Sequence, residues 1–418
     1  MKRALLFLLF ALCTLSVSAQ NRFPKPDFES GYQYPEEHYI VPGEAFWSVV
    51  DIFMLIAMMS IAAWAVIRKR SRTPVIAISL ASVLYFGFFR YGCVCSIGSV
   101  QNVAIALTDS TYVIPLTVVL FFALPLFFAL LFGRVFCSGV CPFGALQDLV
   151  NIKNYRLSKI LTKTLGILPW IYLAFAVMFA VTRSGFIICR FDPFVGIFRL
   201  GGETALIIFG VLLLIASLFT GRPFCRFICP YGALLSLFSR VSVWKINITA
   251  NCINCQLCHN SCPVDAIMPP YENRVKESRA KGVKRILNYF VLLLFMTALG
   301  TFLMRMTSDT LSRVNKNVRL YEMVLQNEIK PQEMQSLDLQ AFYGQGGSVE
   351  VLKHEVDRIK SEFNVWSAIS GGFIGLVIGL TLISLSVKRT RKTYEIDRAG
   401  CVNCGRCFSY CPQNLIKP

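Results

Sequence analysis

Residues 252–263 read CINCQLCHNSCP, and residues 401–412 repeat the same spacing as CVNCGRCFSYCP. Each segment has three cysteines at two-residue gaps and a fourth directly before a proline. A run of this spacing wraps three thiolates around one cubane, while the fourth reaches the neighbouring cluster. The two segments therefore predict a module with two 4Fe–4S clusters. One cluster is expected to take Cys252, Cys255, Cys258 and Cys411, and the other Cys401, Cys404, Cys407 and Cys262.

Cysteine usage along the whole chain favours metal ligation over disulfides. Twelve of the 16 cysteines stand in CxxC or CxxxC spacings, and four of these motifs end in Cys-Pro. Such usage is typical of metal binding in a reducing compartment. A structural zinc site is the alternative for each quartet, but zinc sites usually combine two well separated CxxC pairs. We therefore expect iron–sulfur ligation at both quartets.

Long apolar runs indicate a multi-pass membrane protein. Of the 418 residues, 55% are hydrophobic, and several runs approach the roughly 20 residues that cross a bilayer core. The three histidines all lie outside these runs, which excludes a bis-His haem within the membrane. Residues 1–19 resemble a secretory signal peptide, with an uncleaved first helix as the alternative. Membrane helices are then predicted at 45–67, 74–91, 113–132, 164–182, 204–220, 285–306 and 367–387.

The placement of charge sets the predicted orientation. A net charge of +18 would suit nucleic acid, but the Lys and Arg residues gather beside the ends of the apolar runs, as the positive-inside rule expects. The basic cluster at 68–72 makes the end of the first helix cytoplasmic. Because successive membrane helices cross in opposite directions, a short segment at 20–44 and a helical insertion at 307–366 are expected in the periplasm. We expect an inner-membrane protein that contacts lipid and no nucleic acid.

The two quartets begin 149 residues apart, with two predicted membrane helices and the insertion between them. Because the sixth helix leads out and the seventh returns, both quartets face the cytoplasm. The predicted fold is a multi-pass α-helical membrane protein of about seven helices after the signal peptide. A split bacterial-type two-cluster ferredoxin module of the α+β class lies on its cytoplasmic side. Residues 45–246 form the membrane core, and 247–284 and 388–418 form the two ferredoxin halves.

An internal repeat marks the membrane core. Residues 133–146, GRVFCSGVCPFGAL, match residues 221–234, GRPFCRFICPYGAL, at an offset of 88 residues. Positions i and i+4 share one face of a helix, so the two cysteines of each copy can present their thiolates together. The proline after each second cysteine is expected to end or bend that helix. We expect a third cluster between the repeats; buried free thiols and a redox-active dithiol pair are the alternatives. The four cysteines are Cys137, Cys141, Cys225 and Cys229.

Three further cysteines, Cys93, Cys95 and Cys189, are predicted near the outer face. They suggest an outer centre, to which Asp192 is a candidate oxygen ligand. A disulfide is one alternative, because the outer compartment can oxidise thiols. In another, each repeat has its own cluster, with Cys93 or Cys95 joining the first repeat's pair. That arrangement requires broken or re-entrant helices.

The duplicated GRxFCxxxCPxGAL motif, the Asp-Pro-Phe segment at 192–194 and the quartets resemble the NosR/NapH-type membrane iron–sulfur proteins. The resemblance covers residues 75–270 and 400–415, and it makes the four repeat cysteines the matching membrane-motif cysteines. It implies electron delivery to a periplasmic reductase from quinol or from a cytoplasmic donor. NosR-like members carry a periplasmic flavin-binding domain. Because 20–44 is too short for one, we expect the acceptor to be a separate protein, such as a flavoprotein.

Together these features predict an iron–sulfur carrier that moves electrons across the cell membrane. The donor is expected to be cytoplasmic or the quinone pool, and the acceptor a periplasmic redox protein. As an enzyme the chain would be the electron-transfer component of an oxidoreductase system. One alternative is a maturation factor that reduces metal for a respiratory enzyme. The other is a membrane redox sensor in which 307–366 relays the cluster state to a partner.

Overall fold

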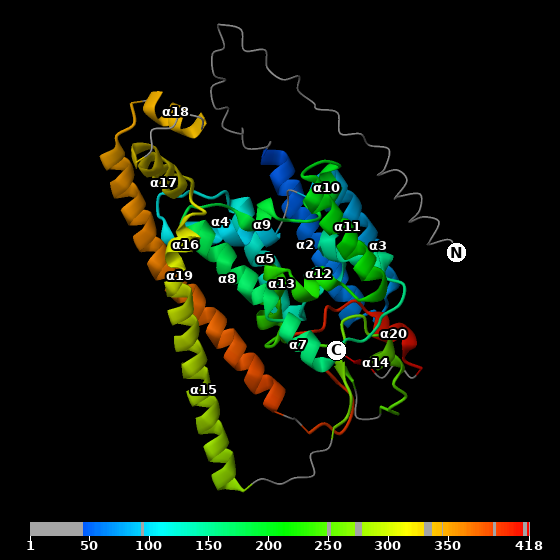
Figure 1. Ribbon diagram of the computed structural model, residues 1–418. Coiled ribbons are helices and arrows are strands. Elements are labelled where there is room, and N and C mark those ends of the chain that lie inside the picture. The colour runs from blue at the N-terminus through cyan, green and yellow to red at the C-terminus, as the bar shows by residue number, and fades with distance from the viewer. Residues whose placement is uncertain are drawn as a thin grey trace.

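Most of the chain is helical in the computed structural model. The structure describes residues 45–92, 96–248, 252–271, 278–329, 337–344, 346–387, 390–412 and 416–417. The predicted signal peptide at 1–19 and the segment 20–44 lie outside the described residues. Figure 1 shows a helical bundle with a long two-helix hairpin along one side, formed by α15 (Arg279–Met306) and α19 (Val349–Ser386). A small module at one end contains α14 (Leu257–Ser261) and α20 (Arg406–Tyr410).

Each of the seven predicted apolar segments contains a helix. Four spans are long and apolar enough to cross a membrane, namely α2 (Ala45–Ile67), α7 (Lys159–Leu165) with α8 (Leu168–Val181), α15 (Arg279–Met306) and α19 (Val349–Ser386). Three apolar helices are shorter, namely α3 (Thr73–Ser82) with its π-helical continuation η1 (Val83–Phe89), α5 (Leu116–Phe132) and α11 (Thr204–Phe219).

Shorter helices connect these longer ones. They are α4 (Ser96–Thr108), η2 (Phe136–Val140), α6 (Pro142–Val150), α9 (Ile187–Arg190), α10 (Val195–Arg199), α12 (Pro223–Phe227) and α13 (Pro230–Ser239). The first repeat folds as η2 and α6, and the second as α12 and α13. An aromatic cluster joins the two copies, because the Phe194 ring lies 5.4 Å from Phe143 of the first and 5.2 Å from Phe224 of the second.

The hairpin of α15 and α19 is packed through glycines. A Cβ atom at Gly300 of α15 would overlap the carbonyl oxygen of Gly371 on α19, and one at Gly375 would overlap the carbonyl oxygen of Met296. Small residues allow helix backbones in a membrane to approach this closely. No residue of α15 is buried, so its apolar side chains outside this contact are available to lipid.

Replacing Gly375 with alanine should destabilise this hairpin by about 1–3 kcal/mol, the usual cost of overpacking a tight contact. Thermal unfolding of the detergent-solubilised protein measures the effect. Gly379→Ala is the matched control, because a Cβ there would meet its nearest atom at an ordinary 3.5 Å. Equal melting temperatures for the two variants would contradict the close packing.

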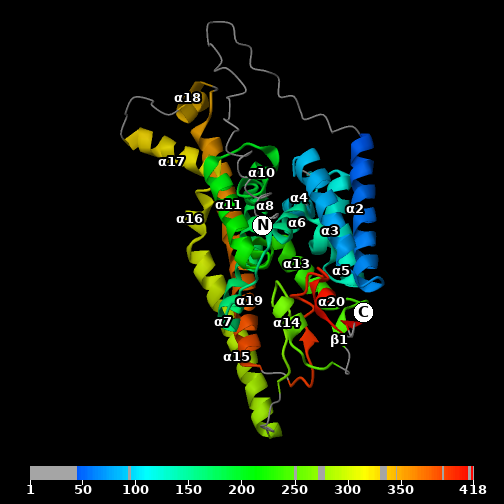
Figure 2. The same cartoon turned by 90° about the vertical axis from the view of Figure 1, so that its right-hand side faces the viewer.

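The described residues of the predicted insertion at 307–366 are mostly helical. They form α16 (Ser308–Ser312), α17 (Lys316–Ile329), α18 (Leu337–Gly344) and the first part of α19. Leu352, Val356, Ile359 and Phe363 of α19 are buried, and they form a cluster with residues that include Val318 of α17. Figures 1 and 2 place α17 and α18 at the opposite end of the molecule from α14 and α20.

The two ferredoxin halves pair through their strands. Strand β1 (Asn247–Ile248) pairs antiparallel with β4 (Ile416–Lys417), and β2 (Ile267–Met268) pairs antiparallel with β3 (Glu395–Ile396). Helices α14 (Leu257–Ser261) and α20 (Arg406–Tyr410) also contact each other. Each strand pair therefore joins the first half to the second, and the two cysteine quartets lie in one module.

Candidate iron–sulfur sites

The second cysteine of each repeat lies between two helices, not on one continuous helix. Cys141 (φ −73°, ψ 118°) and Cys229 (φ −62°, ψ 112°) are extended, and the proline that follows each one begins the next helix. A residue before proline avoids the helical region, and proline is favoured at the first helical position. The expectation that the cysteine pair shares one helix face was therefore wrong. The predicted helix end is observed, because η2 ends at Val140 and α12 at Phe227, and each proline then begins a new helix.

This bend brings all four repeat thiols together. Cys137, Cys141, Cys225 and Cys229 are each buried, with 6–8% of their surface exposed. They line one small cavity, whose other walls are mostly apolar. Neither repeat could form this cavity alone, because each supplies two of the four thiols.

Polar groups around this cavity point at the sulfurs. Gly232 N–H lies 3.2 Å from Cys229 Sγ, Gln147 Nε2 lies 3.6 Å from Cys225 Sγ, and Arg134 Nη2 lies 3.7 Å from Cys137 Sγ. Such donors stabilise thiolates and set the potential of a bound cluster. The donor set and the four thiols suit an iron–sulfur cubane.

A second small cavity lies in the ferredoxin module. It is lined by Cys401, Cys404 and Cys407 of the second quartet and by Cys262 of the first. Ala266 N–H lies 3.3 Å from Cys262 Sγ. Burial, together with the neighbouring Cys404, raises the pKa of the Cys262 thiol to about 11. Cluster binding must therefore displace a proton from this thiol.

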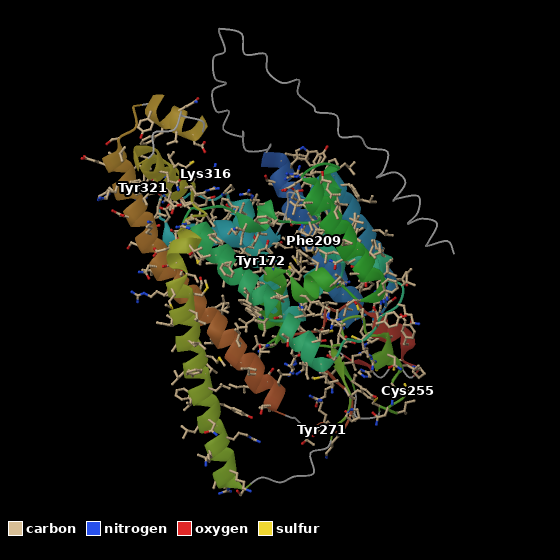
Figure 3. The ribbon with its side chains drawn as sticks, viewed as in Figure 1. Tyr172, Phe209, Cys255, Tyr271, Lys316 and Tyr321 are labelled. Carbon is tan, nitrogen blue, oxygen red and sulfur yellow. The ribbon has the colours of Figure 1, made fainter. Side chains whose placement is uncertain are left out.

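The remaining ferredoxin cysteines gather on the other side of the module. Burial raises the pKa of the Cys258 thiol, and the nearby thiols of Cys252, Cys255 and Cys411 add to the increase. Cys255 is exposed, and Figure 3 shows it at the outer edge of the module. In the part of the chain that the structure describes, no three His, Cys, Asp or Glu side chains are grouped to hold a single metal ion.

The structure places only part of the proposed outer centre. Cys93 and Cys95 lie outside the described residues. Cys189 on α9 is exposed, and its sulfur lies 3.1 Å from the position of a Cβ at Gly98, in the first turn of α4. Asp192 is buried, and its carboxylate accepts a hydrogen bond from Phe194 N–H at 2.9 Å. Asp192 therefore caps its own loop in this structure.

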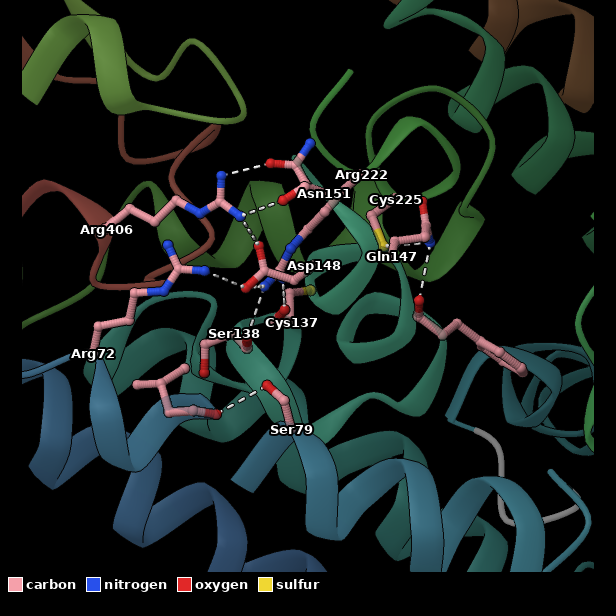
Figure 4. A network of polar contacts seen from close by, with 12 residues as sticks. Arg72, Ser79, Cys137, Ser138, Gln147, Asp148, Asn151, Arg222, Cys225 and Arg406 are labelled. Atoms are coloured by element: carbon pink, nitrogen blue, oxygen red, sulfur yellow. Dashed lines mark hydrogen bonds and ion pairs between the residues drawn. The ribbon is translucent and has the colours of Figure 1, made fainter. Parts of the chain in front are cut away.

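Sequence reasoning missed a buried ionic network between the repeats and the second quartet (Figure 4). Asp148 of α6 lies 3.4 Å from Arg222, 3.5 Å from Arg72 and 3.5 Å from Arg406, measured between carboxylate oxygens and guanidinium nitrogens. Arg406 also donates to Asn151 Oδ1 at 2.5 Å. The signal that could have found it is the Gly-Arg pair that opens both repeats, since Arg222 belongs to the second of these pairs.

Comparison with known proteins agrees with these sites. Residues 114–161 and 203–249, which contain the two repeats, match one family model described as a 4Fe-4S binding domain. Residues 394–417, which contain the second quartet, match another 4Fe-4S binding domain. The chain is thus a mostly helical membrane protein that binds 4Fe–4S clusters.

Three named proteins are similar to parts of this chain. It is 30% identical to the regulatory protein NosR of Stutzerimonas stutzeri over 207 residues, which cover 45% of this chain and 28% of NosR. It is 34% identical to the putative electron transport protein YccM of Escherichia coli, over 32% of this chain and 43% of YccM. It is 30% identical to the ferredoxin-type protein NapH of Haemophilus influenzae, over 37% of this chain and 56% of NapH.

These matches support a likeness of this chain to the NosR/NapH-type membrane iron–sulfur proteins. It spans less than two thirds of the length of each of these three relatives. No solved structure matches it.

Proposed function

We propose that this protein carries electrons across the membrane, between a cytoplasmic or quinone donor and a periplasmic redox partner. The observation that carries the proposal is the buried cavity shared by the four repeat thiols. Arg134 extends from Cys137 Sγ of this cavity, at 3.7 Å, to the carbonyl oxygen of Ala399 in the ferredoxin module, at 3.1 Å. On the other side, Ile97 lines the cavity, and Cys189 Sγ lies 3.1 Å from the Cβ position of the adjacent Gly98. These contacts support a path from the ferredoxin module through the repeat thiols toward Cys189.

Three sets of cysteines would hold the clusters. They are Cys252, Cys255, Cys258 and Cys411 for the first, Cys262, Cys401, Cys404 and Cys407 for the second, and Cys137, Cys141, Cys225 and Cys229 for the third. Bound clusters supply one-electron redox chemistry. The protein's own contribution is to fix the three sites in sequence and to keep water from the innermost one. Relatives named as an electron transport protein and a ferredoxin-type protein support this role.

The proposed orientation in the membrane is based on the placement of basic residues and on the separation of the ferredoxin module from α17. The seven apolar helices would span the inner membrane, with the ferredoxin module in the cytoplasm and 307–366 in the periplasm. The opposite positions of α14 and α17 support this arrangement (Figure 2). The basic residues beside the ferredoxin halves fit the cytoplasmic face.

A quinone donor is supported by a further cavity beside the thiols. Its volume is about 250 Å³, just below the usual range for small-molecule sites. Ile97 and Phe224 line both this cavity and the thiol cavity. Tyr172 and Asp192 supply polar groups in a wall that is otherwise apolar, and Figure 3 shows Tyr172 and Phe209 within the bundle. A flat, largely apolar ring with oxygen atoms at its edge suits this lining.

The acceptor would dock at the periplasmic end. Cys93, Cys95 and Cys189, with Asp192 as a further candidate, would form the outer centre from which it takes electrons. The partner is expected to be a redox protein, with a separate flavoprotein as the leading candidate.

Vesicles that contain the purified protein test this function. Ferricyanide is trapped inside, and either reduced ferredoxin or a short-chain quinol is added outside. Wild-type protein should reduce the trapped ferricyanide, whereas the Cys225→Ser/Cys229→Ser variant should reduce it no faster than protein-free vesicles. The donor that supports reduction identifies the entry route. Equal rates for the variant and the wild type would overturn the proposal.

A further inference from the structure

The Gly-Arg pairs that open both repeats lie at the boundary between the membrane core and the ferredoxin module. Gly133 has φ +75°, and a Cβ there would lie 3.1 Å from Asn403 Nδ2. A Cβ at Gly221 would overlap the carbonyl oxygen of Pro263. Asn403 lies between Cys401 and Cys404, and Pro263 follows Cys262. Both glycines therefore contact the loops that carry the thiols of the second ferredoxin site.

Arg134, the arginine of the first pair, links this boundary to the thiol cavity. Its Nη1 donates to the carbonyl oxygen of Ala399 at 3.1 Å, two residues before Cys401. Its Nη2 lies 3.7 Å from Cys137 Sγ, and the side chain is buried with 6% exposed. One guanidinium thus contacts the ferredoxin backbone and a repeat sulfur together.

Arg222, the arginine of the second pair, occupies the equivalent place and is fully buried. It donates to the carbonyl oxygens of Cys137 and of Ser138, the latter at 2.7 Å. Through Asp148 it is joined to Arg406, which stands between Cys404 and Cys407. The second arginine is therefore connected to both sets of thiols as well.

Positive charge exceeds negative charge in this junction. Arg72, Arg222 and Arg406 surround the carboxylate of Asp148, and Arg134 adds a fourth guanidinium beside Cys137. These five side chains carry a net charge of +3. Charges in a buried, low-dielectric region interact strongly with their neighbours. Reduction makes a cluster more negative, and nearby charge and hydrogen bonds to sulfur set its potential.

We propose that the two Gly-Arg pairs, 133–134 and 221–222, form a cationic junction that seats the second ferredoxin site against the membrane thiol site and favours the reduced state of both. This inference rests on the proposed third cluster at the repeat thiols. The glycines permit the close approach of the two sites, and the arginines supply the charge between them. Arg134 and Arg222 are positioning residues for electron transfer, since they contact the protein around the thiols and need not carry electrons.

EPR-monitored redox titration of the full-length protein tests the junction. Arg134→Gln should retain the iron content of the wild type and shift the midpoint potential of the membrane signal to more negative values. Arg222→Gln should shift the membrane signal and the second ferredoxin signal together, and Arg222→Lys should restore both in part. Arg240→Gln is the matched control, because Arg240 is an exposed arginine near the same module, and it should leave every potential unchanged.

Two outcomes would overturn the junction. One is unchanged potentials in Arg134→Gln and Arg222→Gln at full iron content, and the other is an equal shift in Arg240→Gln. If Arg222→Gln loses iron, the redox titration of Arg134→Gln becomes the deciding test of the junction, because that substitution leaves the Asp148 network intact. If the wild-type protein lacks a third EPR signal, the proposed membrane cluster is refuted. The potential of the second ferredoxin signal in Arg222→Gln would then still test whether the arginine charge favours the reduced cluster.

Discussion

Asp148→Ala should lower the free energy of unfolding by about 3–5 kcal/mol, the usual cost of removing one partner from a buried ion pair. The carboxylate of Asp148 is 6% exposed, and it is shared by Arg72, Arg222 and Arg406. Without it, three guanidinium groups would remain close together with no opposing charge. Thermal or denaturant unfolding in detergent measures the loss.

Asp265→Ala is the matched control for this prediction. Asp265 also pairs with arginines, Arg226 at 3.1 Å and Arg156 at 3.9 Å, but its side chain is 21% exposed. More exposed pairs typically contribute about 1 kcal/mol or less. If both aspartate variants lost the same stability, the network would not be the buried connection that its contacts suggest.

Cys262→Ser should remove the second ferredoxin cluster, although Cys262 belongs to the first quartet. Its thiol lines the cavity of Cys401, Cys404 and Cys407. Cys411→Ser should remove the first cluster in turn, because Cys411 lies near Cys258. Each variant should lose about four irons and one of the two ferredoxin EPR signals.

Two reference variants are needed to show that the fourth cysteine of each quartet binds the cluster of the other quartet. Cys404→Ser identifies the signal of the second cluster, and Cys255→Ser identifies that of the first. The spectrum of Cys262→Ser should match that of Cys404→Ser, and Cys411→Ser should match Cys255→Ser. The opposite pairing would mean that each quartet binds its own cluster without exchange.

Much of the fold could be predicted from local sequence. Each of the seven predicted apolar segments contains a helix, four of them in spans long enough to cross a membrane. The spacing of the quartets, with the out-and-back topology of α15 and α19, predicted that the two ferredoxin halves meet. The burial of Val356 and Phe363 followed from helical periodicity. These features depend on short-range patterns, which a single sequence displays directly.

The parts that could not be predicted depend on contacts between distant segments. The cysteine pairs suggested one helix face, but Pro142 and Pro230 start new helices and turn Cys141 and Cys229 into extended linkers. Asp148 and Arg222 read as ordinary charged residues at helix ends. Only their convergence with Arg406, far along the chain, shows that they form one buried network.

Anaerobic iron counting with EPR, on the wild type and on Cys225→Ser/Cys229→Ser, tests the central claim most directly. The account predicts about twelve irons and three 4Fe–4S signals in the wild type. The variant should retain about eight irons and both ferredoxin signals while losing the third. An unchanged spectrum and iron content in the variant, or about eight irons in the wild type after anaerobic reconstitution, would contradict a cluster at the repeat thiols.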